Sequence, residues 1–140
     1  MKSPILINGV TPPVKITRYE WGLSDLDGGE GTGRSESTGK MFRDRIARAR
    51  RLVIDFADAT VEEMAELQNL VADEFVSITY LDAKDGTWRT DDFYVADRGV
   101  QAMEWDGELE PGVSTDFSGV SWAPSSMEFV GEGNPVEEDA

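Results

Sequence analysis

The chain has 140 residues, which is enough for one domain with or without a short tail. Acidic residues outnumber basic ones 28 to 13, giving a net charge of −15, and the chain contains no His and no Cys. These absences exclude catalytic triads that use His, thiol chemistry, disulfides and zinc sites with Cys or His ligands. The negative charge makes general binding to DNA or to anionic membranes unfavourable.

The N-terminal apolar run is too short for a targeting signal. It extends from Pro4 to Ile7 and stops at Asn8-Gly9, a strong turn pair. No window of the sequence approaches the ~20 apolar residues of a membrane span. We therefore expect a protein without membrane partners, either soluble inside the cell or carried out of it within an assembly.

The first long element is a strand over residues 14–21, where β-branched and aromatic residues alternate with polar ones. Residues 24–39 follow, with five glycines and almost no apolar side chain. This composition predicts a long flexible loop. A loop of this length in a small domain is usually functional, or disordered until a partner orders it.

Residues 40–51 are strongly basic and allow two interpretations. They hold six of the 13 basic residues of the chain against one acid, Asp44. A helix would align Phe42, Ile46 and Ala49 with Val53 in one stripe. A strand would align Phe42 and Ile46 with the apolar positions of residues 52–56. We favour a long strand, or a strand with a bulge, because residues 52–56 alternate clearly.

A helix is predicted over residues 60–73. Thr60 and Glu63 form a capping box, in which the Thr60 side chain accepts from the Glu63 amide and Glu63 reaches back. The opposite face carries Glu62 and Glu66. The apolar stripe that we expect against a sheet consists of Val61, Met64, Leu67, Leu70 and Val71.

The second half of the chain is predicted to form further strands. We expect them at residues 75–81, 87–96, 100–105, 117–122 and 127–130, with a hairpin loop at 82–86 and a bulge at Asp91-Asp92. We expect residues 131–140 to form an acidic, disordered tail. The predicted fold is mainly β with one α-helix: a single domain over 1–130, built as an antiparallel β-sandwich or rolled sheet flanked by the helix.

The Gly-rich loop does not match the sequence motifs of nucleotide or calcium binding. The Gly-rich loop lacks both the Walker and the dinucleotide patterns, because Arg34 stands where each requires glycine. Asp25, Asp27 and Glu36 match positions 1, 3 and 12 of a calcium loop, but Glu30 replaces the glycine needed at position 6. We therefore predict no catalytic residue, no metal ligand and no cofactor, and interpret the loop as acidic and flexible.

Two further sets of residues have an ordinary structural interpretation. The carboxylates of Asp91-Asp92 and of Glu104, Asp106 and Glu108 are expected to be solvated charges. The four tryptophans fall on predicted strands, where core packing is the expected use rather than carbohydrate or single-strand binding. They are Trp21, Trp88, Trp105 and Trp122.

The basic segment needs acids nearby, either within the chain or on a neighbouring copy. An exposed amphipathic segment is the alternative that requires no partner. Contact between copies would match two different surfaces, and such head-to-tail interfaces close into rings. The candidate inter-subunit contacts are Arg43, Arg45, Arg48, Arg50 and Arg51, together with Gly28, Gly29, Gly31, Gly33 and Arg34 of the loop.

The order of these elements resembles that of small phage and prophage tail proteins. The resemblance covers roughly residues 5–130 and includes the segments 5–10, 42–46, 75–80 and 93–98. The same order of elements is similar to that of the wider group of tail-tube and distal-tail ring proteins. That resemblance implies a structural, non-enzymatic virion protein that forms hexameric rings, contacts neighbouring tail proteins, and uses residues 24–39 to reach a neighbouring ring. DNA would then be non-adhesive cargo in a negative lumen, whereas the acidic C-terminal extension departs from the pattern.

Two other classes of function remain open. One is an intracellular adaptor that binds an acidic partner through residues 40–51. The other is a calcium-dependent sugar-binding domain or a small hydrolase that uses carboxylates. The oligomeric state separates the ring from the adaptor, and a calcium titration tests the third class.

Overall fold

The structure is a computed structural model that describes residues 3–27, 33–34, 41–42, 45–132 and 134–135. Its one helix within these residues is α1 (Val61–Leu70). The longer strands are β2 (Ile16–Asp27), β5 (Arg45–Phe56), β7 (Val76–Asp82), β8 (Thr87–Val95) and β11 (Ser125–Gly131). The shorter strands are β1 (Leu6–Ile7), β3 (Gly33–Arg34), β4 (Met41–Phe42), β6 (Ala59–Thr60), β9 (Ala102–Glu104), β10 (Ser121–Trp122) and β12 (Asn134–Pro135).

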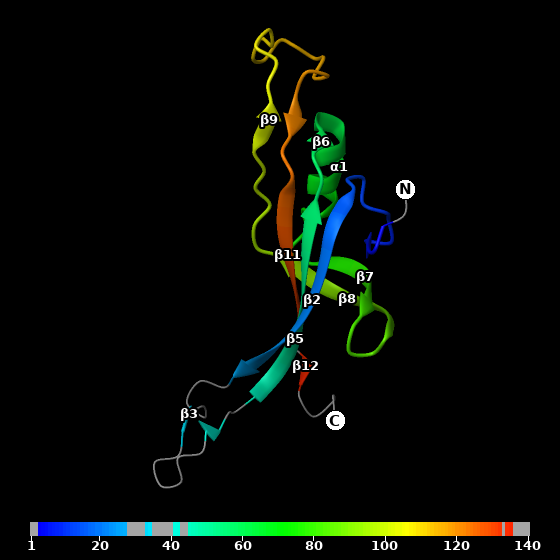
Figure 1. Ribbon diagram of the computed structural model, residues 1–140, viewed down its shortest axis with the longest axis vertical. Coiled ribbons are helices and arrows are strands. Elements are labelled where there is room, and N and C mark those ends of the chain that lie inside the picture. The colour runs from blue at the N-terminus through cyan, green and yellow to red at the C-terminus, as the bar shows by residue number, and fades with distance from the viewer. Residues whose placement is uncertain (1–2, 28–32, 35–40, 43–44, 133, 136–140) are drawn as a thin grey trace.

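The main sheet is antiparallel and curls into a half-barrel (Figure 1). Its strand order is β1-β7-β8-β11-β5-β12, and β2 also pairs with β5. Two smaller sheets are attached, one of order β6-β10-β9 and the other a β3-β4 pair. The prediction of a mainly β, antiparallel fold with one helix is therefore confirmed.

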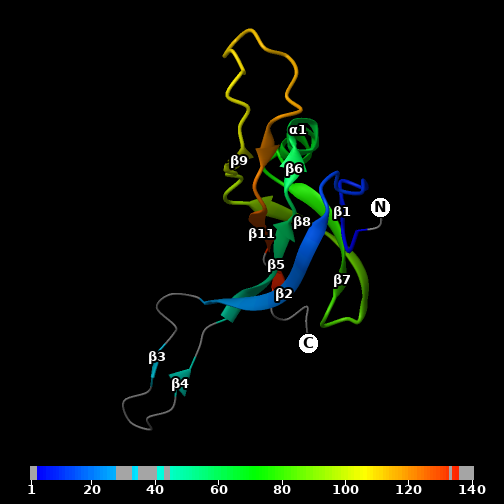
Figure 2. The same cartoon turned by 45° about the horizontal axis from the view of Figure 1, so that its top comes forward.

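The basic segment enters the sheet as a strand, as we favoured. β5 runs without interruption from Arg45 to Phe56 and pairs with β2 along its length. The predicted loop starts too early, because residues 24–27 continue β2 and pair with β5 residues 45–49. The physical reason is that a long partner strand supplies backbone hydrogen bonds to a segment whose own propensity is weak. Figure 2 shows β2 and β5 leaving the half-barrel together, toward β3 and β4.

Three details of the second half differ from the prediction. β8 pairs with β7 in continuous register through Asp91 and Asp92, so the predicted bulge is absent from this pair. The strand predicted at 117–122 is reduced to β10, since the residues before Ser121 belong to a loop. In the predicted tail, Gly131 is buried at the end of β11, and β12 pairs with β5 opposite Arg48 and Ala47. Residues 133 and 136–140 lie outside the described part.

The helix confirms the capping prediction. The Thr60 side chain accepts from the Glu63 amide at 3.2 Å, and the Glu63 carboxylate accepts from the Thr60 amide at 3.0 Å. The helix ends at Leu70, with Val71 as its C-cap, three residues earlier than predicted. Of the apolar stripe, Met64, Leu67 and Val71 are buried in the core, whereas Val61 and Leu70 are partly buried; Glu62 and Glu66 are exposed.

The core fills the inner face of the half-barrel beneath α1. Alternate residues of the strands supply it, because successive side chains of a strand point to opposite faces. Tyr80 and Phe93 meet edge to face at its centre, with ring centroids 5.4 Å apart and planes at 81°. The fully buried large side chains are Ile5, Ile7, Val14, Leu52, Ile54, Phe56, Leu67, Ile78, Tyr80, Phe93, Met127 and Phe129.

Candidate functional site

Charged side chains replace apolar ones on the inner face of the half-barrel, at the end away from α1. Arg50 lies on β5, Asp82 is the last residue of β7, and Arg89 and Asp91 lie on β8. Each of these side chains points inward, because it lies two residues along its strand from another inward-pointing side chain. β8 and β11 separate β7 from β5 in the strand order, and the curl of the sheet brings Arg50 and Asp82 into contact. The result is a polar cluster continuous with the apolar core.

Asp82 is the most completely buried member of this cluster. Arg50 Nε donates to Asp82 Oδ1 at 2.5 Å, and the exposed fractions of the two side chains are 6% and 0%. Trp21 Nε1 donates to the same oxygen at 2.9 Å, and the Asp85 amide donates to Oδ2 at 2.7 Å. Burial alone would raise the pKa of Asp82, but these hydrogen bonds outweigh it, and the pKa lies below its ordinary value.

Asp91 has a similar set of partners. Arg89 Nε donates to Asp91 Oδ2 at 3.0 Å, and the Tyr80 hydroxyl donates to that oxygen at 2.5 Å. Arg89 also donates to Asp85 Oδ2 at 2.7 Å. Burial works to raise the pKa of Asp91, but the bonds from Arg89 and Tyr80 prevail and lower it. Burial and the bond to Asp91 raise the pKa of Tyr80.

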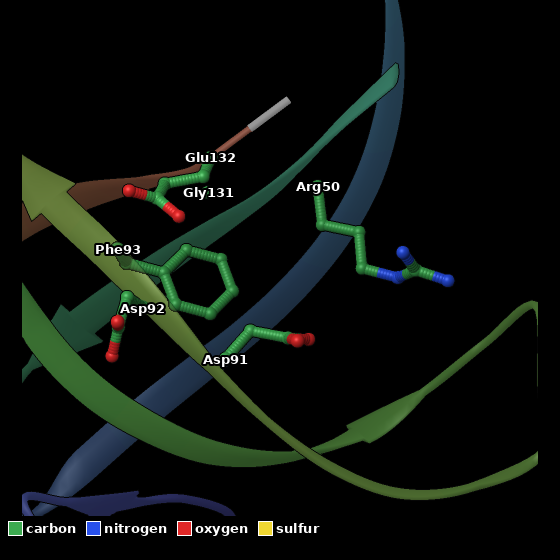
Figure 3. A pocket seen from close by; sticks show the side chains of 6 residues that line it. All are labelled: Arg50, Asp91, Asp92, Phe93, Gly131 and Glu132. Carbon is green, nitrogen blue, oxygen red and sulfur yellow. The ribbon is translucent and has the colours of Figure 1, made fainter. Parts of the chain in front are cut away.

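A small hollow borders this cluster, lined by Arg50, Asp91, Asp92, Phe93, Gly131 and Glu132. Figure 3 shows Arg50, Asp91 and Glu132 around the Phe93 ring. Its volume of about 60 Å³ holds a few water molecules, far below the ~300–1,000 Å³ of a typical small-molecule site. Carboxylates with lowered pKa values are also weak general bases. The chemistry of this cluster is therefore that of a structural ion-pair network.

This network corrects one predicted contact. Arg50 was a candidate for contact between copies, but it is buried and bound to Asp82 of its own chain. The alternation of β5 explains the difference, because Arg50 shares the inner face with Leu52 and Ile54. Arg51 points outward and pairs with Glu128 on the adjacent β11, with 45% of its side chain exposed.

Two of the remaining predicted contacts lie on β5. The backbone register places Arg48 opposite Asp25 and Arg45 opposite Asp27 of β2. Gly33 and Arg34 form β3, whereas Gly28, Gly29, Gly31 and Arg43 lie outside the described residues.

The same register removes the calcium-loop match. Asp25 and Asp27 belong to a paired strand instead of a loop, and Glu36 lies outside the described residues. Among the residues with described positions, no group of three or more His, Cys, Asp or Glu is placed to hold a metal ion. Nor does any helix in that part of the chain have the length and apolar composition to cross a membrane.

The tryptophan prediction is half correct. Trp21 and Trp122 pack against the core, as expected. Trp88 and Trp105 have exposed fractions of 62% and 64%, so core packing is wrong for both.

Trp105 belongs to a projecting segment that we call the arm, residues 102–122. It comprises β9, β10 and the long loop between them, and extends beyond α1 at the top of Figure 1. Its base is held by β10, which pairs Ser121 with Thr60 and Trp122 with Ala59 at the start of α1. A surface hollow of about 370 Å³ lies in the loop, lined by Trp105, Leu109, Glu110, Pro111, Gly112, Ser114 and Phe117.

Two of these features, the buried Asp82 and the arm, were not predicted from the sequence. Asp82 was assigned to a hairpin loop, although an inward Arg50 requires an acidic partner that only another strand can supply. The arm was divided into a strand, a turn and a loop, although its composition carried a signal. After Arg98 the chain has no further Lys or Arg, and aromatic residues accompany the acids.

Comparisons of the chain with protein-family models, with curated proteins and with solved structures found no match.

Proposed function

We propose that the chain is a structural subunit of a phage or prophage tail, which assembles with copies of itself into a ring of the tube or distal-tail type. The ring is a hexamer in this proposal, it contacts neighbouring tail proteins, and no catalytic step is involved. The resemblance of residues 5–130 to small tail proteins is the reason for naming this class.

The observation that carries the proposal is the separation of charge along the molecule. Residues 24–51 have seven basic and five acidic residues, a net charge of +2, whereas the rest of the chain has −17. The basic region includes β3 and β4 at one end of the molecule, and the acidic arm is at the other (Figure 1). A molecule with unlike ends favours head-to-tail contacts, which close into rings when the rotation between copies allows it.

Sedimentation velocity over a range of protein concentrations tests this proposal. We expect a species of about six times the 15.4 kDa monomer mass, with weaker association at higher salt because exposed charges are screened. Negative-stain images of the same sample should show rings. A chain that stays monomeric at all concentrations would contradict the ring and favour the adaptor that binds an acidic partner through residues 40–51.

A further inference from the structure

The arm presents a group of apolar side chains to its surface. Trp105 and Val113 are each 64% exposed, Met103 is 47% exposed and Phe117 is 40% exposed. Trp105 and Phe117 border the hollow of about 370 Å³, whereas Met103 and Val113 lie outside its lining and extend the apolar surface along the chain. An exposed apolar surface with a hollow is typical of an interaction site. Its extent beyond the hollow matches an extended peptide segment better than a single small molecule.

Internal hydrogen bonds hold the arm in a defined shape. The amides of Val113 and Ser114 donate to the Glu110 carbonyl at 3.0 and 2.9 Å, and the Ser114 hydroxyl accepts from the Glu110 amide at 2.8 Å. Nearer the base, the Glu108 amide donates to Asp106 Oδ1 at 2.9 Å. A loop that is already ordered loses less conformational entropy on binding, so its surface is suited to recognition.

Negative charge lies beside the apolar hollow. The arm contains five acids and no Lys or Arg. Glu110 lines the hollow and is exposed. Asp106 directly follows Trp105 in the chain, at one aromatic wall of the hollow. Asp116 directly precedes Phe117, at the other.

The described part of the chain supplies no cation to these acids. The ion pairs among its residues lie in the main sheet and in the hairpin of β7 and β8, and none of them includes an acid of the arm. The Ser118 amide donates to Asp116 Oδ1 at 3.1 Å and holds the pKa of Asp116 below its ordinary value, so this charge persists in mild acid. A partner that complements the arm therefore carries cations next to apolar side chains.

We propose that the arm binds a short cationic segment of another protein, in which Arg or Lys residues stand next to apolar ones. An apolar side chain of that segment enters the hollow. A neighbouring cation reaches the Glu110 carboxylate and stacks on the exposed Trp105 ring, since cations are attracted to the face of an indole. This inference goes beyond the proposed ring and does not depend on it.

Three labelled peptides of equal length test the chemistry of the partner by fluorescence anisotropy with the full chain. In the first peptide, arginine residues separate leucine residues. Glutamate replaces arginine in the second, and serine replaces leucine in the third. At physiological ionic strength we expect the first peptide to bind at least about tenfold more tightly than either of the others, because the arm requires both charge and apolar contact.

Four variants place the binding on the arm. Trp105→Ala removes the aromatic wall, and Glu110→Gln removes the charge at the hollow while keeping the shape of the side chain. Trp88→Ala and Glu66→Gln are the matched controls, because Trp88 is 62% exposed and Glu66 is also exposed, both outside the arm. Urea unfolding confirms that each variant is folded.

We expect each arm variant to weaken binding of the arginine–leucine peptide at least about tenfold, and each control to bind it like the wild type. Equal binding of the three peptides would overturn the proposal. So would controls that weaken binding as much as the arm variants do, because the peptide would then respond only to the net negative charge of the chain.

Sedimentation separates this proposal from the ring. If the wild type stays monomeric and the peptide binds at the arm, the ring is wrong and the peptide site stands. If the peptide does not bind but Trp105→Ala abolishes self-association of the wild type, the occupant of the arm is a second copy of this chain. The peptide site is then wrong and the ring stands.

Discussion

Arg50 and Asp82 form a buried ion pair between two strands that are not neighbours in the sheet. Arg50 lies on β5 and Asp82 on β7, with β8 and β11 between them in the strand order. Trp21 of β2 joins the same carboxylate, and the Tyr19 hydroxyl donates to the Leu81 carbonyl at 2.7 Å. These side-chain bonds span the open side of the half-barrel, where backbone pairing is absent between β2 and β7. The network therefore fixes the curvature of the sheet.

The first prediction is that Arg50→Met destabilises the fold strongly. Loss of one partner leaves the Asp82 carboxylate buried without its cation, and such a loss costs about 3–5 kcal/mol. Arg51→Met is the matched control, because its pair with Glu128 is exposed and exposed pairs contribute about 0–1 kcal/mol. Urea unfolding of both variants measures the difference. Equal effects of the two substitutions would contradict the structural role of the Arg50–Asp82 pair.

The second prediction concerns acid. Hydrogen bonds in the folded state hold the pKa values of Asp82 and Asp91 below the ordinary value of 3.8. Their contribution to stability is complete above about pH 4 and is lost as the pH falls through the folded-state pKa values. Asp82→Asn should lower the free energy of unfolding at pH 7 and make its decline below pH 4 shallower.

The control for the acid prediction is Asp73→Asn, since Asp73 is exposed at the surface after α1. Urea unfolding from pH 7 to pH 2 should give a profile for this control that is parallel to that of the wild type. An Asp82→Asn profile with the same shape as the wild type would show that Asp82 has no altered pKa in the folded state.

The fold was predictable where local pattern and tertiary structure agree. The capping box, the helical stripe and the strand at residues 52–56 all follow from short-range spacing, and the structure contains each of them. The network around Asp82 was not predictable in this way, because it joins β5 to β7 and Arg50 to a residue 32 positions away. The arm was not predicted for another reason. Its apolar side chains stay on the surface, so the sequence of this segment has no hydrophobic periodicity that would indicate a helix or a strand.

The third prediction tests the inner face of α1. Leu67 is fully buried, so Leu67→Ala should cost about 2–5 kcal/mol through lost burial and a residual cavity. Thr60→Ala removes one half of the capping box and should cost about 1 kcal/mol. Glu66 is exposed, and Glu66→Ala should change stability by less than about 0.5 kcal/mol. Urea unfolding gives the order of the three effects, and a Glu66 effect as large as that of Leu67 would mean that the buried face is assigned wrongly.

The fourth prediction concerns the base of the arm, where Gly119 contacts Asp106. A Cβ atom added at Gly119 would lie 2.8 Å from Asp106 Cβ, which is closer than such atoms approach in proteins. The Asp106 side chain is fixed by its bond to the Glu108 amide, so the two sides of the loop must separate. Gly119→Ala should therefore loosen the arm without unfolding the sheet, because the core residues lie elsewhere.

Hydrogen exchange resolves this effect residue by residue. We expect faster exchange of the Val113 and Val120 amides in Gly119→Ala, since both donate within the arm loop. The amides of β7 and β8 should exchange as in the wild type. Gly107→Ala is the control on the same loop, because an added Cβ there meets no atom within 4 Å. If the Gly119 variant kept full protection at the Val113 and Val120 amides, the close approach of Gly119 to Asp106 would not be what holds the arm in its shape.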